Sequence, residues 1–505
     1  MKLKQLALGC TLACAAFAAN AAYPTAVNVA GHTMITMGGA SAPDNFLADI
    51  ANSMMTGVTE YRGRNADGSV DNNFRAFKGL ANGIPGIANG TPIVFQKRSQ
   101  GGSVFGVDPV ARAARVEFID FSKCDDTVTP IRCDTAGIDP GLADHEDPAI
   151  NLGRITDFGV SDVEPAMFRE SLNTENNQPE LSPAERAVLT NVPVNQLMFG
   201  LVATASVPDS VHFSKALYGA ILSGKINNWK QVDASLSEDD SVMVCRRVAG
   251  SGTQASYNAY FNNFPCANGA GGSTAPASVG DGGLGDAVVG GSGTQADPYV
   301  VDPSLVPGQL LVIENSSSGD VRNCLARAND KQDHTVLSAG GEYYKYEFSK
   351  LANPGKAVGI LSLDSYASSG ANTKWSFRML DGAGSFNGST QTASAGATGV
   401  APSKANLVDG KYDFVYELSM QYRNAAVSNV QGDTAPALSG VKLAFFNEFV
   451  KRAGSTKYTG NDGGTFTSVP NAYATLPTVD SYEVKPTLVS KFSRGGNSCA
   501  PLKRF

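Results

Sequence analysis

The sequence predicts an α/β fold with mostly parallel sheets, because segments of strand character alternate with segments of helical character. Near the start, "HTMITMGGASAPDNFLADIANSM" combines a short strand at 33–37, a glycine turn and apolar residues at helical spacing. Residues 195–206, "NQLMFGLVATAS", form a continuous apolar run, which is typical of a strand buried on both faces. The alternation and the buried strand together indicate the fold class.

The first helix is expected to have Ser41 as its N-cap and Pro43 in its first turn, where a missing N–H costs nothing. Later segments continue this alternation. "TPIVFQKRSQGGSVFGVDPVARA" (91–113) has a strand, a Gly-Ser loop and a helix start, and "ITDFGVSDVEPAMF" (155–168) is a strand that ends in a polar turn. "SKALYGAILSGKINNWKQV" (214–232) is a helix closed by Gly224 and followed by a tryptophan loop, and "SVMVCRRVAGSGTQASYNAYFNNF" (241–264) is again a strand, a turn and a helix. "GVKLAFFNEFVKRAG" (440–454) is an amphipathic helix.

Two stretches interrupt this pattern. Residues 268–300 and 380–406 are rich in glycine, serine and alanine and lack periodicity, so we expect surface insertions. The hexapeptide GSGTQA occurs at 250–255 and again at 291–296, inside the first insertion. The second copy runs into an aspartate and a proline, which disfavour a helix, and is interpreted as an insertion turn.

The N-terminus has the features of a signal peptide. Two lysines precede an apolar run at 6–17 that is too short to cross a bilayer, and "ANA" offers a cleavage site near Ala21. A lipidated Cys10 or Cys14 is the alternative, but the flanking residues fit it poorly. The mature chain is expected to be soluble and periplasmic, or to be secreted or held at the cell surface.

The formal net charge of the chain is −7, and removal of two N-terminal lysines leaves −9. An acidic protein has no long-range attraction for nucleic acid or other anions, so no nucleic-acid partner is expected and any anion site must be local.

Six cysteines remain after cleavage, and in an exported chain an even number predicts disulfides. Cys124 and Cys133 are the best pair, because they are close across a turn. Cys245 with Cys266 is unfavourable, since a helix over 253–264 would span about 18 Å while bridged Cα atoms lie within about 7 Å. The other two cysteines are Cys324 and Cys499, and 15 complete pairings exist.

Motifs for catalysis are absent: the chain has no G-x-x-x-x-G-K-[ST], H-E-x-x-H or G-x-S-x-G. His145, in "ADHEDP", suggests a metal ligand, but an acidic loop is the favoured interpretation. A binding protein without cofactor or metal is therefore expected rather than an enzyme.

The turns offer anion-binding chemistry instead. The unpaired N–H groups and partial positive charge at a helix N-terminus suit oxyanions, and this chain has two such starts, at Ser41 and at 251–253. Arg247 lies four residues before Ser251 and is able to form forked, charge-assisted hydrogen bonds. Each signal alone is weak, because most serine N-caps are only caps.

In their order along the chain, these motifs resemble the periplasmic phosphate-binding proteins of ABC transporters, which have the type II periplasmic-binding-protein fold. The matching segments are "GGASAP", "SQGGSVFGV", "DFGVSD", "LYGAILSGKINNW", "RRVAGSGT", "VGILSLDSY", "LAFFNEFVKRAG" and "YATLP".

The resemblance implies two α/β domains with phosphate held between them. After a signal peptide at 1–21, the first domain would comprise 22–198 and 415–505, and the second 199–414. Two hinge strands would cross between the domains, near 195–203 and 411–421.

The resemblance also implies a set of ligand residues. The second loop offers Ser99 or Ser103, of which Ser103 is preferred, and Asp162 follows the motif "FGVS". A carboxylate is an acceptor for the proton of hydrogen phosphate and repels sulfate, which carries no proton at neutral pH. The predicted phosphate-binding residues are Ser41, Ala42, Ser103, Asp162, Arg247, Ser251, Gly252 and Thr253.

One departure from the family concerns position 249. Family members often have an aspartate two residues after the arginine, where this chain has Ala249. Its loss removes an acceptor and a partner for Arg247, so affinity and the discrimination of arsenate are expected to differ.

The resulting prediction is an exported, monomeric phosphate-binding protein that supplies an ABC permease. The alternatives are a binding protein for another oxyanion such as sulfate, tungstate or an organophosphate, and a secreted scavenging or adhesive surface protein without a permease. A structural or adhesive surface protein whose anion site is vestigial is a further alternative. A secreted hydrolase or phosphatase is disfavoured, because no nucleophile–base pair appears.

Overall fold

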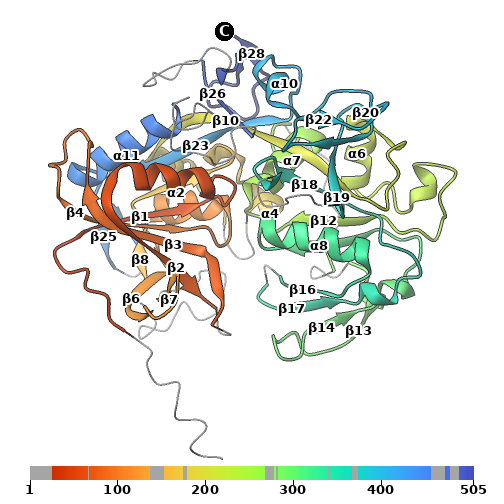
Figure 1. The fold of residues 1–505 in the computed structure, drawn as a ribbon, viewed down its shortest axis with the longest axis horizontal. Helices are drawn as coiled ribbons and strands as arrows, with labels where there is room; N and C mark the ends of the chain where they lie inside the picture. The colour runs from red at the N-terminus through yellow and green to blue at the C-terminus, as the bar shows by residue number, and fades with distance from the viewer. Residues whose placement is uncertain are drawn as a thin grey trace, which may run out of the picture.

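The computed structural model describes residues 25–65, 68–136, 153–174, 179–267, 278–279, 283–338, 340–366, 373–430, 432–455, 472–477 and 488–505. One large mixed sheet dominates the fold (Figure 1). Its strands, in spatial order, are β15 (Leu311–Asn315), β12 (Met243–Arg247), β18 (Ala357–Ser362), β10 (Leu189–Thr204), β23 (Val415–Arg423), β9 (Phe158–Ser161), β1 (Thr33–Gly39), β4 (Pro92–Arg98), β3 (Val70–Ala81), β2 (Met55–Arg64), β7 (Ile131–Ala136) and β6 (Phe118–Asp125).

Two long antiparallel strands, β10 and β23, lie in the middle of this sheet and link its two halves. Figure 1 shows them running across the top, between a half that carries β1 to β4 and a half that carries β12 and β18. Residues 194–204 of β10 are buried without interruption, which confirms the predicted strand buried on both faces. The predicted crossings at 195–203 and 411–421 fall in β10 and across the start of β23. The domain boundaries themselves stay a prediction.

Each half has a parallel core, as the strand–helix alternation predicts. In the first half β1 pairs in parallel with β4 and β9, and in the second half β12 pairs in parallel with β15 and β18. Antiparallel strands β3, β2 and β6 extend the first half. Because a parallel core aligns the carboxyl ends of its strands, the loops after these strands meet at one edge.

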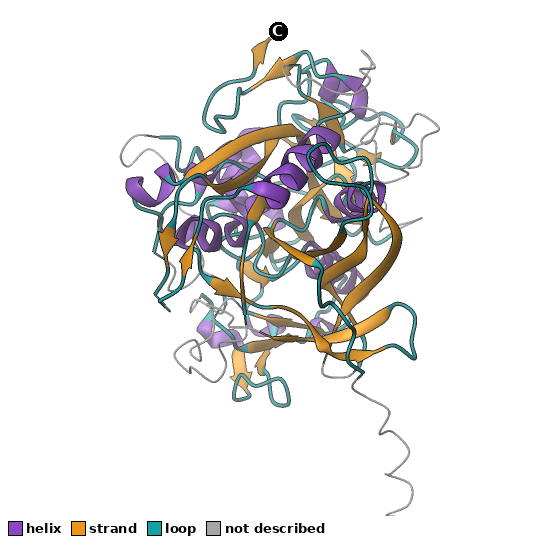
Figure 2. Cartoon of the chain, turned by 90° about the vertical axis from the view of Figure 1, so that its left-hand side faces the viewer, coloured by secondary structure: helices purple, strands orange, loops and turns teal. Residues whose placement is uncertain are grey.

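Helices lie on both halves in Figure 1, and Figure 2, seen from the side of the first half, shows helices beside the strands on that side. Besides the short helix η1 (Ser103–Gly106), they are α2 (Asp44–Ser53), α3 (Asp108–Arg112), α4 (Glu170–Asn173), α5 (Pro183–Ala187), α6 (Lys215–Leu222), α7 (Gly252–Asn262), α8 (Ser318–Asp330), α10 (Lys404–Val408) and α11 (Gly440–Ala453).

Helix α11 is the amphipathic helix predicted near the C-terminus. Phe445 and Phe449 pack against Phe95 of β4 at ring-centroid distances of 5.3 and 5.5 Å, and Phe446 packs edge-on against Phe158 of β9 at 5.2 Å. These rings account for the burial of the apolar face of α11 and fix the helix on the parallel core.

The predicted N-cap at Ser41 is wrong. Helix α2 begins at Asp44, with Pro43 in the cap position and no side-chain cap. Ser41 belongs instead to a turn in which its carbonyl accepts from the N–H of Asp44 at 3.2 Å. The strand before it continues to Gly39, because β1 stays paired with β9 up to Val160, and this displaces the start of the helix.

The other predicted helix starts and stops are confirmed. Helix α7 begins at Gly252 after Ser251, whose backbone is extended, and α6 is followed by Gly224 with φ of 70°. The tryptophan loop after α6 places Trp229 in the core, where its ring nitrogen donates to the Lys356 carbonyl at 2.9 Å.

Part of the glycine-rich stretch 268–300 is not irregular. Strands β13 (Val288–Gly290) and β14 (Tyr299–Val301) form a second, four-stranded sheet with β17 (Tyr343–Tyr346) and β16 (His334–Leu337). Residues 291–296 form the turn between β13 and β14, as predicted, while 268–277 lie outside the described residues.

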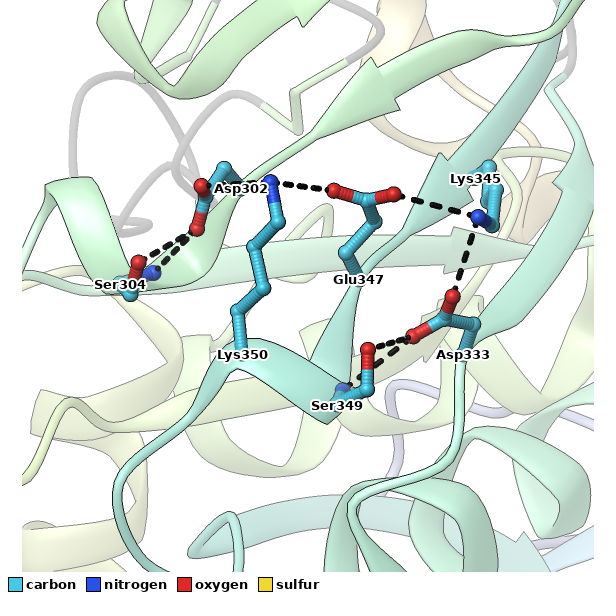
Figure 3. Close-up of polar contacts among 7 residues, drawn as sticks. All are labelled: Asp302, Ser304, Asp333, Lys345, Glu347, Ser349 and Lys350. Carbon is cyan, nitrogen blue, oxygen red and sulfur yellow. Dashed lines mark hydrogen bonds and ion pairs between the residues drawn. The ribbon is translucent and has the colours of Figure 1, made fainter.

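A chain of alternating charges lines this small sheet (Figure 3). Lys350 bridges Asp302 and Glu347 at 2.9 and 2.6 Å, and Lys345 bridges Glu347 and Asp333 at 3.2 and 3.0 Å. Because these groups are partly exposed, each ion pair alone contributes little to stability. Together the pairs connect the insertion to the rest of the small sheet.

The second predicted insertion, 380–406, is also partly ordered. Strands β21 (Ser385–Asn387) and β22 (Thr392–Ala393) extend the main sheet through β19 (Trp375–Arg378), and β20 (Gly382–Ala383) pairs with β11 (His212–Phe213). Phe386 is buried against Tyr366, which explains why this stretch is held against the second half.

The remaining short strands are paired locally. Residues 473–475 form β26 (Tyr473–Thr475), which pairs with β10. Three two-stranded ladders complete the fold: β5 (Arg115–Val116) with β8 (Arg154–Ile155), β24 (Val427–Ser428) with β25 (Thr434–Ala435), and β27 (Phe492–Ser493) with β28 (Lys503–Arg504).

All six cysteines outside the predicted signal peptide form disulfides. The predicted Cys124–Cys133 bridge is confirmed. The others are Cys245–Cys324, which joins β12 to α8, and Cys266–Cys499, which joins the segment after α7 to the C-terminal residues. The pairing Cys245–Cys266 is not formed, as the length of the intervening helix predicts.

None of the helices in the described part of the chain is long and apolar enough to cross a membrane. The predicted signal peptide lies outside the described residues.

Candidate anion-binding site

Polar residues follow the carboxyl end of every strand in the two parallel cores. In the first half Ser41 follows β1, Ser103 follows β4 and Asp162 follows β9. In the second half, residues 248–253 follow β12 and residues 316–318 follow β15. Ligands of open α/β sheets bind outside the carboxyl ends of the strands, so a binding site is expected at this edge.

The loops of the two halves touch each other directly. The N–H of Val104, in the loop after β4, donates to the carbonyl of Gly250 at 2.9 Å. A Cβ added to Gly252 would lie 2.3 Å from Ser103 Oγ and 2.7 Å from Asp162 Cβ. The structure therefore brings Ser103, Asp162 and Gly252 together, and only a glycine fits between the other two.

The start of α7 presents its backbone to this contact. Ser251 is the N-cap in extended conformation, and its side chain makes no cap hydrogen bond. Thr253 Oγ1 donates to Asp162 Oδ2 at 3.4 Å, and Ser251, Gly252 and Thr253 are all buried. The first-turn N–H groups of a helix have no partner within the helix, so this end carries the donors and partial positive charge that an oxyanion needs.

Arg247 supplies a full positive charge to the same place. Only 3% of its surface is exposed, and one of its terminal nitrogens lies 3.4 Å from a Cβ added to Gly102. Two of the groups that hold the guanidinium are acceptors from the start of α8: Nη1 donates to Ser318 Oγ at 3.1 Å, and Nη2 donates to the Ser316 carbonyl at 2.8 Å. Both acceptors are neutral, in the place of the carboxylate that Ala249 does not provide.

Asp162 is the buried acceptor of the site. Its N–H donates to Ser103 Oγ at 3.2 Å, and Oδ2 accepts from Thr253. Its other oxygen, Oδ1, is buried and accepts from no group among the described residues. Burial raises the pKa of Asp162 to about 6, against the opposing attraction of Arg247, so the carboxylate is ionised at pH 7 and above.

Ser41 and Ala42 lie on the same edge, just after the end of β1. The N–H of Ala40 donates to the Val160 carbonyl at 2.9 Å, which sets the turn at Ser41 beside the strand that leads to Asp162. Ser41 Oγ is buried without a hydrogen-bond partner among the described residues. Tyr473, from β26, donates its hydroxyl to the Ala42 carbonyl at 3.1 Å and holds the turn in place.

The two serines proposed for the second loop have different surroundings. Ser99 accepts from Lys97 Nζ at 2.7 Å and donates to Asp44 Oδ2 at 2.6 Å, so its hydroxyl is already engaged. Ser103 lies against Asp162 and Gly252. This favours Ser103, the preferred residue, as the one that faces an anion.

Sequence reasoning missed Lys97, a buried cation beneath the site. Its ammonium donates to the carbonyls of Gly39 and Ala40 at 3.0 and 3.1 Å and pairs with Asp44 at 3.3 Å. Burial lowers the pKa of Lys97, and the charge of Asp44 opposes that shift. A lysine near the end of a strand that begins with apolar residues, in "TPIVFQKRS", is the signal that points to it.

Sequence reasoning also missed Ser316, Ser318 and Asp364. The run "NSSSGD" after a strand has the form of a capping box, and this places serines at a helix start beside β12. Asp364 follows β18, is buried, and has its pKa raised by burial to about 7. The charge of Asp162 raises the pKa of Asp364 in the same direction as burial does, so the two carboxyl groups lie within electrostatic range of each other.

A polar cavity lies elsewhere, around the start of α11. It has a volume of about 490 Å³ and is lined by residues that include Arg115, Asp157, Arg423 and Lys442. Lys442 is paired with Asp157 at 2.6 Å and Arg115 with Asp433 at 2.7 Å, so much of its positive charge is compensated. Despite its size, it is a weaker candidate for an anion than the strand-end site.

Within the residues that the structure covers, no group of three or more histidine, cysteine, aspartate or glutamate side chains is placed to hold a metal ion. His145, the one histidine discussed as a metal ligand, lies outside the described residues.

Comparison with known proteins gives structural neighbours but no sequence family. No family model and no curated protein matches the chain. The solved structures that resemble it include several that are described as phosphate-binding proteins or phosphate transport receptors.

Three of these structures illustrate the range. An ABC-type phosphate transport receptor from Vibrio cholerae is 15% identical, with 59% of this chain and 74% of that chain covered and a TM-score of 0.27. A human phosphate binding apolipoprotein is 12% identical, with 87% and 90% covered and a TM-score of 0.39. A high affinity periplasmic phosphate-binding protein, PfluDING, is 13% identical, with 88% and 91% covered and a TM-score of 0.38. Function is inferred from the side chains of this chain, since likeness at this level does not transfer it.

Proposed function

We propose that this chain is an exported solute-binding protein that binds inorganic phosphate reversibly between the two halves of its sheet. The ligand residues would be Ser41, Ala42, Ser103, Asp162, Arg247, Ser251, Gly252 and Thr253. The observation that carries the proposal is the buried Asp162, with one unpartnered oxygen, in contact with the α7 start and within electrostatic range of Arg247.

This combination of one acceptor among donors suits hydrogen phosphate. Arg247, the hydroxyls and the first N–H groups of α7 donate to the anion's oxygens. Asp162, ionised at neutral pH, accepts the proton of the P–OH group. Sulfate has no such proton and would place its oxygen lone pairs against a buried carboxylate, which is costly.

Entry of the anion would require the two loops to separate, because Ser103 and Gly252 lie against each other, and closure would then bring both loops onto the bound anion. The strands β10 and β23 link the halves and are the natural hinge for a rigid-body opening. On this view the first domain comprises 22–198 and 415–505, and the second comprises 199–414.

The three disulfides and the signal-like N-terminus support export to an oxidising compartment, such as the periplasm. Delivery to an ABC permease is part of the proposal because the motif order resembles that of transporter-linked proteins. The protein itself would catalyse no reaction.

Isothermal titration of the mature chain at pH 7.5 tests the proposal. We expect one phosphate per chain and no measurable binding of sulfate at the same concentration. Phosphate should also raise the melting temperature, since a ligand that binds only the folded state stabilises it.

Tungstate and an organophosphate in parallel titrations separate the alternatives. Binding of one of these without phosphate would assign another oxyanion, and no binding of any of them would leave the site vestigial and overturn the proposal. Fractionation of cells into periplasm, surface and medium, followed by immunodetection, decides where the protein resides.

A further inference from the structure

Arg247 is held by the start of α8, a part of the fold that the sequence motifs do not assign to the site. Strands β12 and β15 are parallel, and Arg247 is in register with Asn315. The N–H of Val248 donates to the Asn315 carbonyl at 3.1 Å, so the chain leaves both strands at the same level. The residues after β15 therefore lie beside the arginine because the strand register places them there.

The cap of α8 leaves Ser318 available. Ser317 is the N-cap and forms a capping box with Asp320, and Ser316 Oγ also donates to Asp320 at 2.8 Å. Ser318 is the first residue of the 13-residue helix and takes no part in this cap. Its Oγ accepts from Arg247 Nη1 at 3.1 Å.

The hydroxyl of Ser318 is still able to donate one hydrogen bond. A serine hydroxyl is one donor and two acceptors. Ser318 is buried, with 8% of its surface exposed, and among the described residues its proton goes to no acceptor. A buried donor of this kind beside an arginine suits the oxygen of an anion.

We infer that Ser318 is a further phosphate-binding residue, which positions Arg247 in place of the carboxylate missing at Ala249 and donates its own hydroxyl to the anion. The inference rests on the proposed phosphate function. It also implies a chemical difference from an aspartate at position 249: Ser318, a neutral acceptor, holds Arg247 without adding a negative charge beside a doubly charged ligand.

The test is a titration series with inorganic phosphate at pH 7.5 on the full mature chain. Ser318→Ala should lower the affinity about 10- to 100-fold, since hydrogen bonds to charged groups are the strong ones. Ser318→Thr keeps the hydroxyl and should bind within about threefold of the wild type, a rescue that a purely structural role of residue 318 does not predict.

Ser316→Ala is the matched control, because Arg247 bonds the backbone carbonyl of Ser316 and not its side chain. It should bind phosphate as the wild type does. Equal losses in Ser316→Ala and Ser318→Ala would overturn the inference, since they would report damage to the α8 cap.

Ala249→Asp provides a second route that does not depend on the folding of Ser318→Ala alone. In the Ser318→Ala background the new carboxylate should recover at least tenfold in affinity, and in the wild type it should change the affinity less than threefold. The same effect in both backgrounds would show that Ser318 does not replace a carboxylate at position 249 as the partner of Arg247.

The two proposals fail in different ways. If the wild type binds no phosphate, the proposed function is wrong and the inference falls with it. If the wild type binds phosphate and Ser318→Ala binds it equally well, only the inference is wrong.

Discussion

The two copies of GSGTQA, at 250–255 and 291–296, have the same six residues and different structures. In the first copy, Gly250 has a φ of 81°, Ser251 caps a helix, and all six residues are buried. In the second copy, Gly291 and Gly293 have φ of 92° and 80°, and most of the residues are exposed in a turn between β13 and β14.

The flanks cause this difference. The first copy follows a buried parallel strand and precedes residues that pack against the core as α7. The second copy precedes Asp297, whose N–H donates to Thr294 Oγ1 at 3.1 Å and closes a local turn. A hexapeptide therefore says little about anion binding until the strand, the arginine and the helix around it are known.

The largest expected effect is at Gly252, the third residue of the first copy. Gly252→Ala would place a Cβ 2.3 Å from Ser103 Oγ and force the two loops apart. Alanine is a good helix former, so α7 should persist while phosphate binding is abolished. The measurement is titration calorimetry together with circular dichroism.

Gly290→Ala, next to the second copy, is the control, because a Cβ there meets no atom within 4 Å. It should bind phosphate as the wild type does. Retained binding in Gly252→Ala would mean that the anion lies elsewhere.

A second test compares Asp162 with the exposed Asp297, which follows the second copy. The folded-state pKa of Asp162, about 6, lies above its ordinary value. A carboxyl group with a raised folded-state pKa lowers the free energy of unfolding as the pH rises from about 4 to about 6. The reason is that, in this window, the folded state binds the proton more tightly than the unfolded state does. Asp162→Asn should therefore raise the unfolding free energy of the ligand-free chain at pH 8 by about 3 kcal/mol, with no gain below about pH 4.

Denaturant melts at pH 4 and pH 8 measure this difference, and Asp297→Asn should change stability by less than about 0.5 kcal/mol at both pH values. The same Asp162→Asn variant should accept sulfate more readily. A gain in stability that is independent of pH would show that the carboxylate is not strained by burial.

The smallest of the expected effects is at the threonines of the two copies. Thr253→Ala removes the hydroxyl that bonds Asp162 and should weaken phosphate binding about tenfold, which is roughly one hydrogen bond to a charged group. Thr294→Ala, the same change in the second copy, should leave the affinity unaltered. Equal affinities for the two variants would remove the functional distinction between the copies.

Local patterns predicted much of the secondary structure, because they depend on neighbours in sequence. The end of α6 at Gly224, the start of α7 after Ser251, and the bridge between Cys124 and Cys133 follow from a glycine, an N-cap and a short turn. The buried run of β10 follows from its unbroken apolar sequence.

Long-range contacts account for what was missed. Strand β1 extends to Gly39 because it pairs with β9, more than a hundred residues away, and this moves the start of α2 from Ser41 to Asp44. Strand β14 forms in a glycine-rich stretch because β17 supplies its partner. The bridges Cys245–Cys324 and Cys266–Cys499 span 79 and 233 residues.

The sequence by itself determined the fold class and the set of anion-binding residue types, since strand–helix alternation and helix-start chemistry are local properties. Only the tertiary structure decided that Ser103, Asp162 and Gly252 touch, and that Ser318 and the Ser316 carbonyl hold Arg247 where Ala249 leaves no carboxylate. The physical reason is strand register, because the pairing of β12 with β15 sets which loops meet at the sheet edge, and no local pattern encodes it.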